Sequence, residues 1–172
     1  MSEIREIVTK AVIAKGKKTL ILNENIPTTV NPYSILGCWI INHEFEATKT
    51  SLDSVKIIGE FEINIWYSES NNTKTEIIRE TIQYTKDIQI KTIVKDFIEN
   101  TDDILARIIQ HPTVTNAKIF DDSIEAEISL EILAEVIGET KMKVTVFNPE
   151  TTWEDEVDVT DMDINEEFIN LK

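Results

Sequence analysis

The sequence predicts a mainly β protein, an antiparallel β-sandwich-like domain followed by an acidic C-terminal tail. Apolar and polar residues alternate in several segments, residues typical of turns separate these segments, and the composition changes after Phe147. The 172 residues are enough for one well-buried core and few for two. We therefore expect a β-rich domain over residues 1–147 and a tail over residues 148–172.

The first segment of the chain is ambiguous. Apolar residues at positions 4, 7, 8, 11 and 12 fit a helical stripe with Ser2 as its cap, whereas residues 10–26 read as a strand with an irregularity at Gly16. We expect a short helical start at most. Residues 26–32 form a predicted loop, because Pro27 and Pro32 cannot donate hydrogen bonds to a sheet.

The most apolar stretch, SILGCWIINHEF at 34–45, predicts a central strand buried on both faces. Gly37 would allow a close approach or a bulge, and Trp39 would anchor the core. Under regular alternation Cys38 and His43 face opposite sides of the sheet, which excludes a direct nucleophile and base pair. We expect Cys38 to be a small buried hydrophobe and His43 to be a hydrogen-bonded core or interface histidine.

The later segments give clearer signals. Residues 55–67 and 124–132 alternate as strands with one solvent-exposed face. The asparagines at 71 and 72 predict a hairpin turn after the strand at 55–67. A break is expected at Asp121-Asp122. Residues 102–112 could form a helical turn capped by Thr101 or a strand bent at a sheet edge by Pro112, and the β surroundings favour the strand.

Two residues of the 55–67 strand stand out because they are apolar on its otherwise polar face. Ile58 and Trp66 are therefore candidates for self-association, because their apolar side chains could contact another copy of the chain. The alternative is that a neighbouring loop of the same chain covers them.

The formal net charge of −15 argues against binding a nucleic-acid backbone or an anionic membrane surface. Residues 148–172 contain nine acidic residues and one lysine, so about eight of the net negative charges lie in the tail. Apolar residues interleaved with these acids are a pattern suited to docking on a partner, and a merely solvated tail is the alternative; the apolar residues are Trp153, Val157, Met162, Ile164, Phe168 and Ile169.

Neither an enzyme nor a cofactor is indicated. The sequence lacks the common nucleotide-binding, esterase and metalloprotease motifs, and His111 has no metal-ligating residue at a suitable spacing. A single cysteine and the absence of an export signal at the start predict synthesis in a reducing cytoplasm. No apolar run approaches the roughly 20 residues that cross a bilayer.

Three blocks, SILGCWIINHEFEA, INIWYSESNNTKTE and LAEVIGETKMKV, together resemble the outer spore-coat morphogenetic protein CotE family of endospore-forming Firmicutes. REIVTKAVIAKGKK near the start resembles the opening of that family, and the block around Gly138 resembles related spore-coat assembly domains, which implies a sandwich-like fold with Gly138 in an architectural role.

The resemblance implies a non-enzymatic scaffold made in the mother-cell cytoplasm and later part of the spore coat. It would form a homo-oligomer around the forespore, be directed there by a basement-layer coat morphogenetic protein, and recruit outer-coat proteins partly through its C-terminal region. The alternative is a monomeric β-sandwich binding module for a small ligand or carbohydrate, with Trp66 and Tyr84 exposed for ligand contact.

Overall fold

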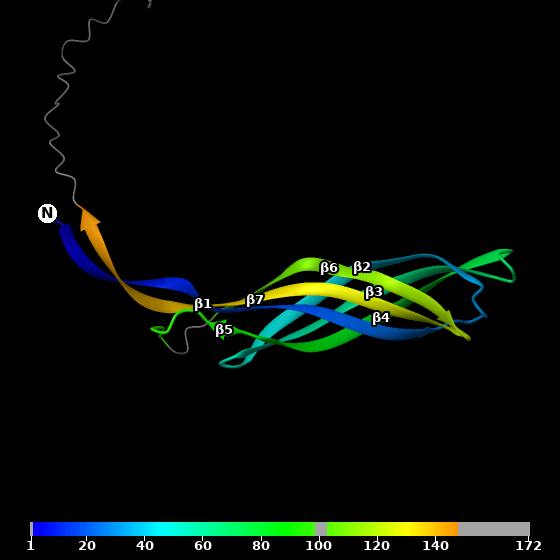
Figure 1. The fold of residues 1–172 in the computed structure, drawn as a ribbon, viewed down its shortest axis with the longest axis horizontal. Helices are drawn as coiled ribbons and strands as arrows, with labels where there is room; N and C mark the ends of the chain where they lie inside the picture. The colour runs from blue at the N-terminus through cyan, green and yellow to red at the C-terminus, as the bar shows by residue number, and fades with distance from the viewer. Residues whose placement is uncertain (1, 99–102, 148–172) are drawn as a thin grey trace, which may run out of the picture. The chain divides into compact units, whose positions relative to one another are not determined.

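The computed structural model describes residues 2–98 and 103–147, and within them it contains strands and no helix (Figure 1). The mainly β prediction is therefore confirmed. The strands are β1 (Ser2–Pro27), β2 (Ser34–Ser51), β3 (Ser54–Glu69), β4 (Lys74–Gln89), β5 (Lys91–Thr92), β6 (Asp103–Phe120) and β7 (Ser123–Phe147). The described residues include no helix that could span a membrane.

The strands form two sheets. One has four strands in the order β5-β1-β7-β6, and the other has three in the order β2-β3-β4. Neighbours β2 and β3, β3 and β4, and β6 and β7 pair antiparallel. The predicted hairpin turn is present, because Ser70, Asn71 and Asn72 have φ of 50°, 58° and 65° between β3 and β4. Asp121, with φ of 51°, makes the predicted break before β7.

Of the two alternatives for the start of the chain, the helix is not found, since β1 is a strand from Ser2 onward. A short helix is stabilised in a protein mainly by packing one apolar face. Ile4 and Val8, which belong to the predicted stripe, are exposed instead. β1 obtains its backbone partners from the sheet, and its buried side chains lie further along the strand, at Leu20, Leu22 and Ile26.

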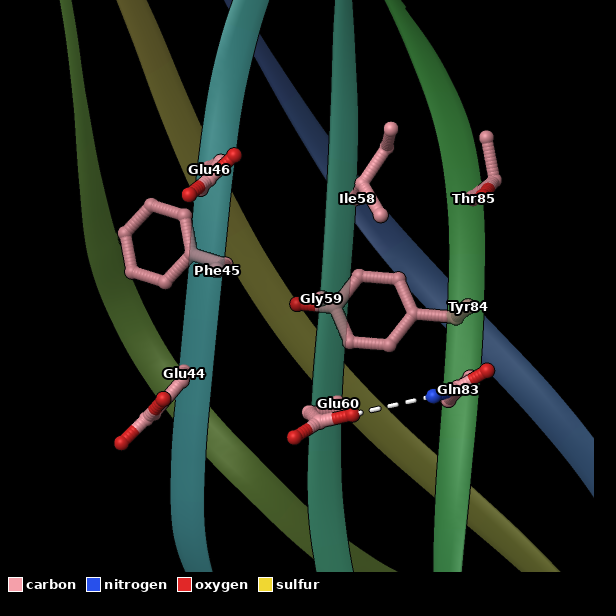
Figure 2. A pocket seen from close by; sticks show the side chains of 9 residues that line it. All are labelled: Glu44, Phe45, Glu46, Ile58, Gly59, Glu60, Gln83, Tyr84 and Thr85. Carbon is pink, nitrogen blue, oxygen red and sulfur yellow. Dashed lines mark hydrogen bonds between the residues drawn. The ribbon is translucent and has the colours of Figure 1, made fainter.

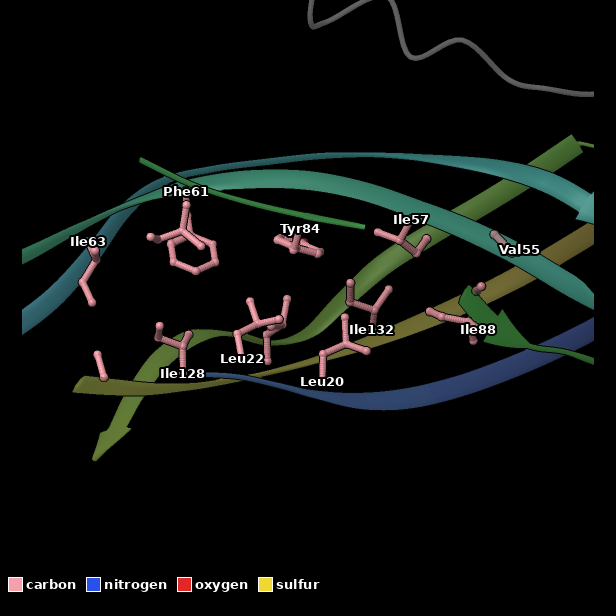
Figure 3. Close-up of a cluster of buried hydrophobic side chains, with 14 of the residues drawn as sticks. Leu20, Leu22, Val55, Ile57, Phe61, Ile63, Tyr84, Ile88, Ile128 and Ile132 are labelled. Carbon is pink, nitrogen blue, oxygen red and sulfur yellow. The ribbon is translucent and has the colours of Figure 1, made fainter. Parts of the chain in front are cut away.

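The core lies between the two sheets. Ile57, Phe61 and Ile63 of β3 point toward Ile128 and Ile132 of β7 (Figure 3). The alternation predicted for residues 55–67 and 124–132 is thereby confirmed, because the apolar phase of each strand is the buried one.

The segment before Pro112 belongs to the edge strand β6. Among the described strands β6 pairs with β7 alone, and its register with β7 shifts between Gln110 and Thr113. Pro112, which has no N–H to donate, sits within this irregular stretch. The prediction of a strand bent at an edge is confirmed.

The chain divides into two compact units. The core unit, Ile7–Met142, contains the packed sheets just described. The second unit combines residues 1–6 with residues 143–172, and its described part consists of the first residues of β1 and the last residues of β7. In that unit Arg5 Nη2 lies 3.0 Å from Glu3 Oε2.

Candidate interaction surface

β2 is an edge strand and not the predicted central strand, because within the described part of the chain it pairs with β3 alone. Trp39 is 42% exposed, so it does not anchor the core, and Leu36 and Ile41 are exposed as well. The expectation of burial on both faces was wrong for a physical reason. A continuous apolar run indicates two apolar faces, but here only one of them has a sheet packed against it.

Two of the three register shifts between β2 and β3 lie in the apolar half of β2 and change which side chains face the core. The register with β3 shifts between Ile35 and Gly37 and again between Ile41 and Glu44. At the second shift Asn42 has φ of 54°, a left-handed conformation that asparagine tolerates well. Gly37 lies at the first bulge, where an added Cβ would find its nearest neighbour, Trp39 Cζ3, at 4.0 Å. The bulge at Gly37 matches the prediction, but no close approach requires the glycine.

Because of the second bulge, Cys38 and His43 lie on the same, core-facing side of β2, and the prediction of opposite faces is wrong. Cys38 is half-buried and packs against the hydrophobic core, and burial raises the pKa of its thiol. This agrees with a cysteine acting as a small hydrophobe, since a buried thiol is less often the reactive thiolate.

His43 lies in an aromatic cluster beneath the three-stranded sheet. A hydrogen bond of 2.7 Å joins its Nε2 to the Tyr84 hydroxyl, and its ring centroid lies 5.6 Å from that of Phe45 and 6.2 Å from that of Phe61. Desolvation, and secondarily the charge of His111, lowers the pKa of His43. The hydrogen-bonded histidine expected here is therefore present, and its neutral form fits its packing role.

Tyr84 is only 5% exposed, so the exposed ligand contact on which the binding-module alternative depended is wrong for this residue. Its ring reaches from β4 across β3 at Gly59 (Figure 2). A Cβ added at Gly59 would lie 2.6 Å from Tyr84 Cζ, so the glycine provides the space that the ring occupies. Burial raises the pKa of Tyr84 to about 12.

A shallow hollow of about 450 Å³ lies over Gly59 (Figure 2). Phe45, Gly59 and Tyr84 line it together with exposed residues, which are Glu44, Glu46, Ile58, Glu60, Gln83 and Thr85. Gln83 Nε2 donates a hydrogen bond of 3.0 Å to Glu60 Oε2. Its carboxylates give this hollow an acidic rim.

Next to the hollow, the outer face of the three-stranded sheet carries a group of exposed apolar side chains. We call it the tryptophan face, and it consists of Leu36, Trp39, Ile41, Trp66 and Ile77. The strand register holds the group together, because Trp66 pairs with Gly37 on one side and Ile77 on the other. In the next row Asn64 stands between Trp39 and Arg79. Sequence reasoning missed Trp39 as a member because the apolar run of β2 predicted burial on both faces.

Both self-association candidates lie on this outer face. Trp66 is 42% exposed and belongs to the tryptophan face, and Ile58 is 52% exposed at the hollow, in register with Glu46 and Thr85. Both side chains stay about two-fifths to one-half exposed, so no loop within the described ranges 2–98 and 103–147 buries them. The loop that was considered as an alternative cover is therefore not found there.

The remaining candidate residues fall in two places. Gly138 is buried within β7. Trp153, Val157, Met162, Ile164, Phe168 and Ile169 lie outside the described residues. Among the described residues, no group of three or more His, Cys, Asp or Glu side chains is placed to hold a metal ion.

Comparison with known proteins gives a family. The family described as outer spore coat protein E (CotE) matches residues 3–172, nearly the whole chain. No curated protein and no solved structure matches. The match over this length includes the strands that carry the tryptophan face and continues to Lys172. The chain therefore belongs to the outer spore coat protein E (CotE) family.

Proposed function

We propose that the protein is a non-enzymatic scaffold that assembles with further copies of itself and recruits other proteins to the outer coat. Membership of the CotE family gives it an outer spore coat role and a final location in the spore coat. The observation that carries the self-assembly proposal is the tryptophan face, which places two tryptophans and three aliphatic side chains in solvent on one side of one sheet.

The tryptophan face has the size and composition of an interface centre. Its five side chains are each about two-fifths to one-half exposed, which amounts to on the order of 400 Å² of apolar surface. A stable interface buries about 800 Å² per partner and is a little more than half apolar. Tryptophans at the centre of an interface are also its most frequent sources of binding energy.

A second copy fits this face because the face can complement itself. Trp39 and Arg79 lie in one row, on either side of Asn64. A two-fold axis parallel to β3 would bring Trp39 of each copy against Arg79 of the other and Trp66 against Trp66. A guanidinium over an indole ring is a favourable contact, and the two-fold symmetry of an isologous interface produces this contact twice.

We further propose that residues 148–172 recruit outer-coat proteins and that a basement-layer coat morphogenetic protein directs the scaffold to the forespore from the mother-cell cytoplasm. Support for recruitment comes from the interleaved acidic and apolar residues of this segment, a pattern suited to docking as a peptide. The half-buried thiol of Cys38, the neutral packed His43 and the family assignment support a structural role over catalysis.

The test is the mass of the full chain by light scattering across a wide concentration range in reducing buffer. Replacing Trp39 and Trp66 together by serine should raise the concentration at which copies associate at least about a hundredfold, because buried interface tryptophans typically contribute 2 kcal/mol or more each. Leu52 and Phe120 are also exposed hydrophobic residues, away from this face, so the variant with serine at these two positions is the control. Equal masses for the two variants would refute the proposal.

A further inference from the structure

An isologous contact closes on itself after two copies, so a scaffold that extends over a surface needs a second contact of a different kind. This inference rests on the proposed function and concerns the other sheet. There, on the outer face of the four-stranded sheet, lies an open hollow of about 460 Å³. We call it the lysine hollow, and it is lined by Lys15, Gly16, Lys17, Gln89, Lys91, Leu133 and Glu135.

The short strand β5 brings two like charges together at this hollow. Lys15 of β1 and Lys91 of β5 are direct register partners, and like charges in such positions destabilise a sheet. The approach is fixed by Gly16, because a Cβ at that position would collide with the backbone carbonyl of Gln89. The backbone thus holds the two lysines at one edge of the hollow.

The acidic residues nearby already have partners. Lys17 Nζ lies 3.0 Å from Glu131 Oε1, and Arg107 Nη2 lies 2.8 Å from Glu135 Oε2. In the part of the chain that the structure describes, neither Lys15 nor Lys91 forms an ion pair. The hollow therefore has uncompensated positive charge at its edge and the half-buried side chain of Leu133 as an apolar part of its lining.

We propose that the lysine hollow of one copy binds the acidic segment 148–172 of a neighbouring copy. The segment carries nine acidic residues and a single lysine, with apolar residues between the acids. Carboxylates would pair with Lys15 and Lys91 while an apolar neighbour contacts Leu133. The rest of the chain, residues 1–147, is itself net negative and would repel an acidic segment. A positively charged site on its surface would attract that segment.

We assign the segment to a neighbouring copy because an extended scaffold needs a second, heterologous contact beside the isologous one. The hollow has the volume of a site for one small molecule, so it engages a few residues and leaves the remainder of the segment for recruited proteins.

Zero-length carbodiimide cross-linking of the full chain tests this contact. A mixture of ¹⁵N-labelled and unlabelled protein is treated and digested, and the cross-linked peptides are identified by mass spectrometry. We expect peptides that join Lys15, Lys17 or Lys91 to carboxylates of residues 150–167, including pairs of mixed isotopic composition. The absence of such pairs overturns the proposal, and pairs of uniform isotopic composition alone overturn it as a contact between copies.

Charge reversal provides the matched comparison. In the Lys15→Glu, Lys91→Glu variant, Lys17 remains as the reporter, and its cross-link to Glu131, 3.0 Å away, is the internal standard. The yield of the cross-link from Lys17 to the segment, relative to that standard, should fall about tenfold because two ion pairs are replaced by repulsion. Lys74→Glu, Lys118→Glu changes the net charge equally, away from the hollow, and should leave the ratio unchanged. Equal ratios in the two variants overturn the proposal.

Salt separates this contact from the tryptophan face. At about 1 M salt, electrostatic attraction between exposed groups is screened beyond roughly 3 Å, so the cross-links to the segment should disappear while association through the apolar face persists. If at about 1 M salt the parent chain associates and the tryptophan variant stays monomeric, while the cross-links form only at low salt, both proposed contacts are retained. If the parent chain never associates at high salt yet the cross-links form at low salt, the contact at the lysine hollow is supported and association through the tryptophan face is refuted.

Discussion

Replacing Gly59 by alanine should unfold the protein more easily, because the Tyr84 ring occupies the space of the missing side chain. An added Cβ would lie 2.6 Å from Cζ and from the hydroxyl oxygen of Tyr84, and 2.9 Å from the carbonyl oxygen of Glu44. Two of these neighbours belong to a ring buried in the core, and the third is backbone. None can move away as the end of a flexible side chain would.

The expected size of the effect follows from the cost of overpacking. Inserting one methyl group into a well-packed core typically costs 1–3 kcal/mol of unfolding free energy. Displacing Tyr84 would also strain its hydrogen bond to His43, for which a typical net contribution is about 1 kcal/mol. We expect a loss of about 2–3 kcal/mol, less the few tenths to about 1 kcal/mol that alanine gains over glycine in a strand.

The assay is urea unfolding followed by tryptophan fluorescence and circular dichroism at low protein concentration. With a slope of about 2 kcal/mol per molar urea, the midpoint should fall by about 1 M. Gly37→Ala is the control, because its new Cβ would have its nearest neighbour at 4.0 Å. Its midpoint should stay constant or rise. Equal midpoints for the two variants would refute the account of Gly59 and Tyr84.

Three further outcomes are expected of the packing beneath the sheets. Tyr84→Phe keeps the ring and removes the hydrogen bond to His43, so it should cost about 1 kcal/mol in the same urea assay; an unchanged midpoint would contradict that bond. The pKa of His43 is lowered on folding from its ordinary value of 6.5, so the unfolded chain binds the proton first as pH falls, and stability is lost progressively below about pH 6.5. Unfolding titrations between pH 7.5 and 5 should show this loss in the parent relative to His43→Phe, and parallel curves would contradict it. Ile128→Ala should cost about 2–5 kcal/mol because its side chain is fully buried, whereas Ile58→Ala should change the stability of a single copy by less than about 0.5 kcal/mol; similar losses would mean that Ile58 is covered.

Sequence patterns predicted the strands that have one buried face. In β3 and β7 the period-2 alternation has a physical cause, because one face contacts the opposite sheet and the other contacts water. The turns at Asn71 and Asp121 were predictable for a local reason, since they need positive φ and residues that tolerate it. These parts of the fold depend on interactions that the local sequence determines.

The pattern failed where the answer depended on distant parts of the chain. The apolar run of β2 indicates two apolar faces, but whether a second layer covers each face is decided by the other sheet. The bulge at Asn42 inverts the alternation halfway along the strand, so Cys38 and His43 share a face in spite of their odd spacing. The local signal for this bulge was Asn42 within an apolar run, and an asparagine there is also compatible with an ordinary solvent-exposed position of a regular strand.

The same bulge has an evolutionary consequence. Substitutions can change which side chain stands at a given place on β2, but a one-residue insertion or deletion near Asn42 would shift the whole strand on one side of it by one position. Such a change would exchange the set of side chains in solvent with the set in the core in a single step. The length of β2, more than its composition, is therefore what natural variation must preserve for Trp39 to stay on the surface of the protein.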